Sequence, residues 1–268
     1  MGAWLEIGDR VFVRRYAFAD QAIGAVLGDD GVLVVDTRAT YRQARELLGD
    51  LRGVTSLPVR AVVNTHFHWD HTFGNRVFRP APIWGHARCG PAMLAAEARV
   101  RAELASTYPA LAADFDEVAL DPPDEVLDER ALIDAGGREV ELRFLGRAHT
   151  DHDIVVIVGD SDVVFAGDVV ENGAPPWYGD GFPLDWPATA DGLVALVRGA
   201  VVPGHGPVGD RAFAAEQAAA VRLVADLARS VDRGELGIED ALARAPWPAR
   251  ASRDALHRGL AQLRGELP

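Results

Sequence analysis

The histidine-rich segment at residues 64–71 constrains this chain more than any other part of the sequence. It places three histidines and one aspartate within six positions, directly after a run of three apolar residues. Such a run is typical of a buried strand, so these side chains fall in the loop where a strand ends. Imidazole nitrogen and carboxylate oxygen are ligands that Zn²⁺, Fe and Mn²⁺ share, and His66 and His68 point to the same side of an extended backbone. The segment therefore predicts a metal site, with Asp70 and His71 placed to reach a second ion.

Chance is a poor alternative explanation for this grouping. The chain has only eight histidines in 268 residues, so three within six positions are hard to explain as unrelated surface residues. The single cysteine, Cys89, cannot form an internal disulfide, and we expect it to be a small buried hydrophobe. Metal binding would therefore rest on histidine and carboxylate side chains.

The composition predicts a globular protein and excludes some partners. Hydrophobic residues make up 49% of the chain and charged residues 25%, while the formal net charge is −13. This acidic balance, without a run of five or more basic residues, disfavours nucleic acid as a partner. We also find no apolar run of about 18 residues and no signal peptide, so the sequence predicts a cytoplasmic protein with no membrane association.

The predicted elements alternate between strands and helices along most of the chain. We expect strands at 10–15, 22–27, 31–35, 58–65, 82–86, 131–134, 139–145, 162–166 and 199–202. We expect helices at 40–51, 91–107 and 211–231, followed by further helix to the end. The segment 108–128 is predicted to be a surface excursion, and 169–186 an irregular loop rich in glycine and proline.

Further potential ligands follow three later strands. His149, Asp168 and His205 each come shortly after a predicted strand, and Asp36 ends an earlier one. Ligands at the ends of four separate strands indicate one site assembled from loops on a rigid sheet scaffold. For Asp36 two roles stay open, support of the metal ligands or capping of its loop.

Together these motifs resemble those of the metallo-β-lactamase superfamily of hydrolases. The matching elements are His-x-His-x-Asp-His at 66–71, Gly-x-x-His-Thr around His149, Phe-Ala-Gly-Asp ending at Asp168, and Pro-Gly-His-Gly around His205. The resemblance implies an α/β fold, a four-layer αββα sandwich with the site at one edge of the two sheets. The resemblance covers residues 1–210, which we expect to form the catalytic domain. It leaves residues 211–268 unaccounted for, and we expect these to form a helical C-terminal segment packed on that domain.

The resemblance assigns the ligands of two divalent metal ions, which we expect to be Zn²⁺, with Fe or Mn²⁺ as alternatives. The first ion would be held by His66, His68 and His149, the second by Asp70, His71 and His205, with Asp168 bridging both. His86 and His152 lie outside the matching positions. We expect His86 to be structural and leave the role of His152 open between structure and support of the ligands.

The implied activity is that of a dinuclear metal-dependent hydrolase. A metal-bridging hydroxide would attack an ester, thioester, lactone or related acyl bond, with Asp70 as the catalytic residue that orients it and relays a proton. Asp168 differs from the residue that true β-lactamases of this fold generally carry, and Glu171 differs from the tyrosine of the lactonase branch. The alternatives are a β-lactamase or phosphodiesterase of the same fold, a mononuclear iron persulfide dioxygenase, and a non-catalytic metal-binding protein.

Aromatic residues supply the predicted substrate contacts, and we expect a small-molecule acyl substrate with an apolar part. Three of them, Trp177, Tyr178 and Phe182, lie in the predicted loop soon after Asp168. Phe18 and Trp69 are further candidates. The alternative is that these aromatics only pin a long loop to the protein surface. The sequence leaves the oligomeric state open, a homodimer included.

Overall fold

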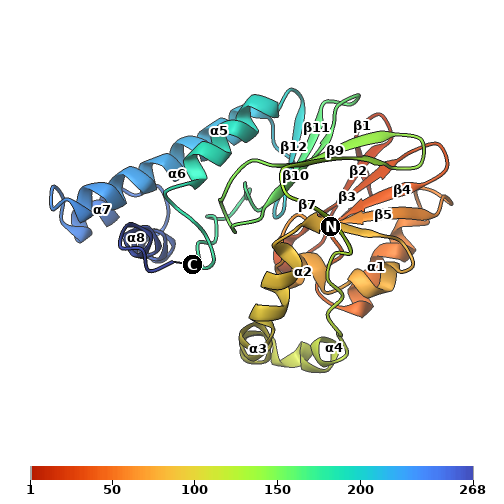
Figure 1. Ribbon diagram of the computed structural model, residues 1–268, viewed down its shortest axis with the longest axis horizontal. Coiled ribbons are helices and arrows are strands. Elements are labelled where there is room, and N and C mark those ends of the chain that lie inside the picture. Colours follow the sequence, from red (N-terminus) through yellow and green to blue (C-terminus); the bar gives the residue numbers. More distant parts are fainter. Residues whose placement is uncertain (1, 268) are drawn as a thin grey trace.

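The computed structural model describes residues 2–267, and its strands form two sheets that pack face to face (Figure 1). The first sheet has the order β1-β2-β3-β4-β5-β6-β7. Its strands are β1 (Leu5–Gly8), β2 (Val11–Arg15), β3 (Ala22–Leu27), β4 (Val32–Val35), β5 (Val59–Val63), β6 (Ile83–His86) and β7 (Glu125–Leu127). The second sheet has the order β12-β11-β10-β9-β8. Its strands are β8 (Arg130–Asp134), β9 (Glu139–Phe144), β10 (Ile154–Val158), β11 (Val163–Gly167) and β12 (Ala200–Pro203).

Helices lie on both outer sides of the paired sheets. In Figure 1, α1–α4 lie below the strands and α5–α8 extend from them to the left. Residues of α1 pack on the first sheet and residues of α5 on the second. The helices are α1 (Tyr41–Leu51), α2 (Trp69–Thr72), α3 (Cys89–Thr107), α4 (Ala112–Asp116), α5 (Trp186–Leu196), α6 (Arg211–Asp232), α7 (Ile238–Arg244) and α8 (Ala249–Leu263). Three short 3₁₀ helices are η1 (Phe18–Asp20), η2 (Asn75–Phe78) and η3 (Pro109–Leu111). The predicted four-layer αββα sandwich is confirmed.

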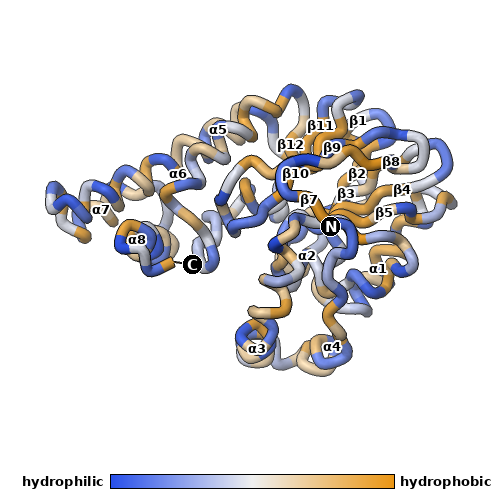
Figure 2. The backbone as a smooth tube through the Cα atoms, viewed as in Figure 1, coloured by the Kyte–Doolittle hydropathy of each residue, from blue (hydrophilic) through white to orange (hydrophobic). Residues whose placement is uncertain are grey.

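The hydrophobic core has three main layers that follow from this arrangement. Val35 of β4 and Phe165 of β11 belong to the layer between the sheets. Leu47 of α1 packs on the outer face of the first sheet, and Trp186 of α5 on the outer face of the second. Figure 2 shows the central strands as largely hydrophobic. Strands that are covered on both faces bury consecutive residues, which explains the unbroken apolar run of β4.

Parallel pairing brings the chemically active loops together. β4 pairs in parallel with β5, with Val35 opposite Val63, and β11 pairs in parallel with β12, with Gly167 opposite Pro203. The carboxyl ends of parallel neighbours meet at one edge of a sheet, where such folds build their sites. The loops after these four strands therefore lie at a common edge.

Several parts of the chain differ from the sequence-based expectation, among them β1 and α5, where no strand or helix was predicted. No strand was predicted at β10, whose continuous apolar residues show no alternation, yet it lies between β9 and β11. The segment 108–128 was predicted to be a surface excursion, but it contains α4 and also β7, which pairs in parallel with β6. That strand is short and partly exposed, and it depends on its partner rather than on its own pattern.

The C-terminal segment is helical, as expected. α6 packs along α5 and α8, and its buried face includes Ala214, Val221 and Val224. A domain boundary at residue 210 stays a prediction. Among residues 2–267, no helix is both long enough and apolar enough to span a bilayer.

Candidate metal centre

The seven side chains predicted to be metal ligands lie in two neighbouring groups at the carboxyl ends of the strands. The first group contains His66, His68, His149 and Asp168, and the second contains Asp70, His71 and His205. Within each group the potential ligand atoms all lie within 4.8 Å of one another. Ligation itself remains a prediction, and the geometry of each group tests whether these residues fit an ion.

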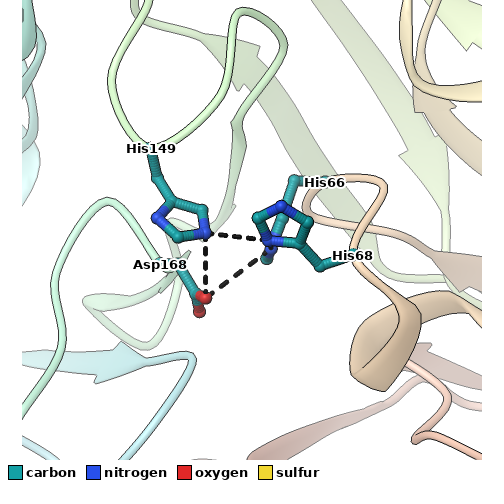
Figure 3. A group of neighbouring side chains, drawn as sticks. All are labelled: His66, His68, His149 and Asp168. Atoms are coloured by element: carbon teal, nitrogen blue, oxygen red, sulfur yellow. Dashed lines mark hydrogen bonds and ion pairs between the residues drawn. The ribbon is translucent and has the colours of Figure 1, made fainter. Parts of the chain in front are cut away.

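In the first group, three imidazole nitrogens converge with one carboxylate oxygen (Figure 3). His68 Nδ1 lies 2.9 Å from Nε2 of His66 and 2.9 Å from Nε2 of His149. Asp168 Oδ2 lies 3.6 Å from His66 Nε2 and 3.3 Å from His149 Nε2. His66 and His68 follow β5 of the first sheet, whereas His149 and Asp168 follow β9 and β11 of the second. The group is therefore built by both sheets.

The second group lies beside the first. The Nε2 atoms of His71 and His205 are 3.3 Å apart, and Asp70 Oδ2 is 3.5 Å and 3.4 Å from them, respectively. Asp70 and His71 lie on the short helix α2. Asp168 also reaches this group, with Oδ1 3.5 Å from His71 Nε2 and Oδ2 3.3 Å from His205 Nε2. Its carboxylate thus lies between the two groups, where a bridging ligand would be required.

Glycine at position 204 permits this close approach. A side chain at Gly204 would overlap the carboxylate of Asp168. Gly206 has a φ of +92°, and a side chain there would overlap the backbone of Asn172. Only glycine tolerates both the backbone conformation and the contact, which lets the loop that carries His205 lie against Asp168.

In each of three histidines, one ring nitrogen makes a polar contact with the surrounding protein, and this contact fixes which nitrogen faces the centre of the group. His149 Nδ1 donates to the carbonyl of Trp177 at 3.0 Å, and His205 Nδ1 donates to the carbonyl of Ala19 at 2.6 Å. A carbonyl can only accept, so in the neutral rings the Nε2 atoms carry lone pairs. His68 presents Nδ1 instead, because its Nε2 lies 3.2 Å from Asp180 Oδ2. Lone pairs directed into a site, with the other nitrogens hydrogen-bonded, are the arrangement that metal-binding histidines adopt.

Asp36 supports ligands of both groups. Its carboxylate accepts hydrogen bonds from the backbone N–H of Thr65 and the hydroxyl of Thr65, both at 2.9 Å, and from His71 Nδ1 at 2.8 Å. The Thr65 hydroxyl in turn accepts from His66 Nδ1 at 3.1 Å. Asp36 has a φ of 66°, a conformation that costs about 1–3 kcal/mol for residues other than glycine and that persists only where contacts enforce it. Of the two roles left open by the sequence, the structure favours support of the ligands.

Burial and the clustered charges shift the pKa values of these groups in opposite directions. Burial lowers the pKa of His66 well below its ordinary value and that of His149 to about 3. Burial also opposes protonation of His71, but Asp168, Asp70 and Asp36 outweigh it and raise its pKa to about 9. Burial alone would raise the pKa of Asp168, yet the surrounding histidines, with His205 first among them, hold it well below the usual range. In the first group, His66 and His149 thus offer neutral imidazoles and Asp168 an ionised carboxylate at neutral pH.

These residues fit divalent metal ions. Oδ1 of Asp168 is buried without a hydrogen-bond partner, and several imidazole lone pairs meet with no protein donor between them. Leaving such acceptors unsatisfied is costly, and a cation at the centre of each group would satisfy them. Nitrogen and carboxylate oxygen donors are a set that Zn²⁺ accepts.

A cavity of about 330 Å³ opens over both groups. Trp69 and Trp177 lie on its wall together with Tyr108, and the Trp177 ring centroid is 5.1 Å from that of His68. The same wall includes charged residues, namely Asp20, Arg99, Glu103, Glu171 and Asp180. Its surface is therefore partly aromatic and partly charged.

Of the five aromatic residues that were predicted to contact the substrate, two line the cavity and three do not. Trp69 and Trp177 line the cavity, and Trp177 is 45% exposed. Tyr178 and Phe182 are buried and neither lines the cavity, so the structure gives no support to their predicted contact with the substrate. Tyr178 packs against Trp186 and Trp247, and Phe182 lies under the guanidinium of Arg147. Phe18 does not line the cavity either, but its ring supports those of Trp69 and Tyr108 from behind.

Sequence reasoning missed a polar link across the cavity mouth. Asp180 pairs with Arg99 of α3 at 2.9 Å and also contacts His68. Although burial opposes it, these two partners lower the pKa of Asp180 below its usual range. Glu171 was noted only as a departure from a family motif, yet it is buried beside Asp168, and burial raises its pKa to about 8. No local pattern marks these residues, since α3 and the loop after β11 meet only in the folded chain.

The remaining candidates lie outside both groups. His86 is buried, accepts a hydrogen bond from the backbone N–H of Arg88 at 3.0 Å, and packs against Phe144. His152 pairs with Asp151 at 2.6 Å. These contacts agree with structural roles. Cys89 is fully buried, as predicted.

The chain resembles known proteins over most of its length. The family model described as "Metallo-beta-lactamase superfamily" matches residues 20–227. A type 2 metallo-beta-lactamase of Bacillus cereus is 25% identical over 203 residues, which cover 72% of this chain and 72% of that protein. A metallo-beta-lactamase structure from Pontibacter korlensis aligns with a TM-score of 0.63 and 20% identity, covering 82% of this chain and 98% of that one.

Two further relatives are alkylsulfatases. A linear primary-alkylsulfatase of Pseudomonas sp. (strain ATCC 19151) is 39% identical over 49 residues, which are 18% of this chain and only 9% of that protein. A structure of the sec-alkyl sulfatase PisA1 aligns with a TM-score of 0.78 and 15% identity, covering 98% of this chain and 50% of that one. At this identity the alignment speaks for the fold alone, and its coverage includes the C-terminal helices.

Proposed function

The chain belongs to the metallo-beta-lactamase superfamily, and from this membership we propose that it is a dinuclear metal-dependent hydrolase acting on an acyl bond. The observation that carries the proposal is the position of Asp168 between two groups of donors, directly below an open cavity. Structural metal sites are usually closed by four protein ligands on one ion. Seven donors shared between two adjacent groups leave room for water and substrate.

The two groups define which side chains would hold the ions. His66, His68 and His149 would hold one, Asp70, His71 and His205 the other, and Asp168 would contact both. Bound there, two divalent ions would polarise the scissile bond and lower the pKa of a water molecule.

Asp70 is the side chain best placed to handle protons. It lines the cavity with 6% of its surface exposed, and its backbone carbonyl accepts a hydrogen bond from Gln21. We assign it two tasks, orienting the attacking water and passing its proton to the leaving group. Asp36, Trp177 and Ala19 hold the histidines in place, so the donors need little rearrangement during turnover.

The cavity wall supports a substrate with an apolar group beside the reacting bond. Trp69, Tyr108 and Trp177 offer aromatic surface next to the donors. Arg99 is the only arginine on the wall among the described residues, and Asp180 already pairs with it. We therefore propose a neutral apolar acyl group as the part of the substrate held here, in an ester, thioester or lactone.

A second candidate is hydrolysis of an alkyl sulfate ester. One observation favours it: the linear primary-alkylsulfatase is 39% identical to this chain over 49 residues. An alkyl chain would suit the same aromatic wall. The two candidates differ only in the group at the metal centre.

A substrate panel tests both candidates. Metal-loaded protein is assayed on carboxylic esters, thioesters, lactones, phosphodiesters, β-lactams and alkyl sulfates, before and after chelation. We expect turnover of the acyl substrates, lost on chelation and restored by Zn²⁺. Turnover of sulfate esters alone would favour the second candidate. A metal-loaded protein inactive on every substrate would favour a non-catalytic metal site.

A further inference from the structure

A second cavity, of about 370 Å³, lies on the side of the first sheet and has an unusual wall. Four arginines line it, namely Arg14, Arg15, Arg38 and Arg42, and Glu46 is the only carboxylate among its lining residues. Tyr16, Phe18 and Gln43 line it as well. Such a concentration of guanidinium groups is unexpected in a chain with a net charge of −13.

Arg38 forms the base of this arginine cavity. Its side chain is only 3% exposed, and its guanidinium carbon lies 3.6 Å from the ring centroid of Tyr16. The Nε atom of Arg38 is buried and has no hydrogen-bond partner among the described residues. The residue also has a φ of 69°, in the left-handed region that long side chains avoid. A buried cation held in a strained conformation with an unused donor indicates a position kept for a purpose other than packing.

The acidic partners of the other arginines lie behind them. Arg14 pairs with Asp50 at 3.0 Å and Arg42 with Asp114 at 2.6 Å, while Arg15 pairs with Asp20. These three carboxylates do not line the cavity. They pair with the guanidinium groups without themselves lining the cavity. Only Glu46, which pairs with Arg38 at 2.7 Å and is 55% exposed, faces the cavity with them.

We propose that the arginine cavity binds the oxyanion group of a small organic anion, a phosphate, sulfate or carboxylate. Guanidinium groups match the geometry of such oxyanions and bind them through paired N–H donors. The cavity is large enough for one oxyanion together with part of the molecule that carries it. The bound group would satisfy Arg38 Nε and displace or reorient Glu46.

This site is distinct from the metal centre, although one segment of chain borders both. Phe18 lines the arginine cavity and packs against Trp69 of the metal-site wall. The next residue, Ala19, lines the metal-site cavity and accepts the hydrogen bond from His205. The proposed site does not depend on the proposed hydrolase activity, since its residues are not among the seven donors.

The test measures binding of inorganic phosphate to the metal-loaded full chain by calorimetric titration at constant ionic strength. Arg42→Gln removes one wall cation, and Arg45→Gln is its matched control. Both arginines lie on α1, are 61% and 59% exposed, and pair with an acid near α4, but Arg45 does not line the cavity. Glu46→Gln removes the only wall carboxylate.

We expect Arg42→Gln to weaken phosphate binding about fivefold and Arg45→Gln to leave it unchanged, since an exposed ion pair contributes up to about 1 kcal/mol. Glu46→Gln should tighten binding by about threefold to tenfold, which a purely structural set of ion pairs would not produce. The proposal is overturned if wild-type protein binds no phosphate. It is equally overturned if all three variants bind as the wild type does, because the phosphate would then lie at the metal centre.

Discussion

The carbonyl of Trp177 accepts a hydrogen bond from Nδ1 of His149 at 3.0 Å, while the indole of the same residue lines the cavity above the donors. One residue thus holds a predicted metal ligand through its backbone and offers a contact surface through its side chain. Its backbone N–H also donates to Glu171 at 2.9 Å. A change of the side chain therefore leaves both backbone contacts available.

Replacing Trp177 with alanine should affect binding more than chemistry. We expect KM to rise about tenfold with a smaller change in kcat, because an apolar contact is made equally in the ground and transition states. Steady-state kinetics on the best substrate of the panel, together with metal analysis, measure this. Metal content should stay that of the wild type. Unchanged KM and kcat would show that the indole does not contact the substrate.

Tyr178→Phe is expected to be silent in the same assay. The hydroxyl of Tyr178 is buried without a hydrogen-bond partner, and the side chain does not reach the cavity. Removing an unsatisfied buried hydroxyl should leave kinetics unchanged and stability equal or higher, by up to about 1 kcal/mol. Chemical denaturation measures the free energy of unfolding. Loss of activity in this variant would return Tyr178 to the list of substrate contacts.

Asp70→Ala should lower turnover by about 10² or more while leaving the fold intact. The change removes one donor of the second group and the proposed proton relay. Activity, metal content and circular dichroism are measured together, with His257→Ala as the control, since His257 is exposed on α8. Turnover equal to that of the wild type would remove Asp70 from the mechanism.

Asp36→Asn tests the support of the ligands. The carboxylate accepts three hydrogen bonds from Thr65 and His71. The amide has only one accepting oxygen and carries no negative charge, so it cannot replace all three. We expect metal affinity to fall by about tenfold to 100-fold, as is usual when such supporting carboxylates are removed. Competition with a chromophoric chelator measures this affinity. Asp50→Asn, at a carboxylate that accepts from Tyr16, serves as the control. Equal affinities in the two variants would contradict the assignment.

Metal uptake should depend on pH differently at the two groups. His71 has a raised pKa of about 9 in the metal-free protein, so below that pH its proton must leave before its nitrogen can bind an ion. Although burial opposes it, Asp168 and Asp70 also raise the pKa of His205 well above its ordinary value, so affinity at the second group should rise by at least about tenfold per pH unit up to pH 9. His149 has a pKa lowered to about 3 and is already neutral, so affinity at the first group should change little near neutrality. Zn²⁺ titrations at several pH values would show either two different slopes or, against this prediction, one common slope.

Much of the fold followed from local patterns. The long strands and helices have clear apolar runs or faces, such as the inward residues Ala44 and Leu47 of α1, and Thr40 caps that helix as its residue type suggests. β10 was missed although its apolar run is like that of β4, because periodicity alone does not tell a short buried strand from another buried segment. β7 was missed because a short edge strand exists only through its pairing with β6.

The donors were predictable for a different reason. Each one follows a strand, and parallel strands bring their carboxyl ends together, so His149, Asp168 and His205 could be grouped before any distance was known. No comparable rule predicts which residues line the cavity. Trp177 and Tyr178 are neighbours in an irregular loop where no periodicity tells an exposed ring from a buried one. Asp180 and Arg99 meet only because α3 and that loop pack together.

The order of the donors along the chain has a consequence during synthesis on the ribosome. His66, His68, Asp70 and His71 emerge first and lie on the first sheet side, whereas His149, Asp168 and finally His205 come from the second. Domains begin to fold as they emerge. If these donors hold two ions as proposed, the early segment can capture an ion with an incomplete set of donors, but both ions would be fully enclosed only after residue 205 has left the exit tunnel. Any nascent chain shorter than this carries a partly open site.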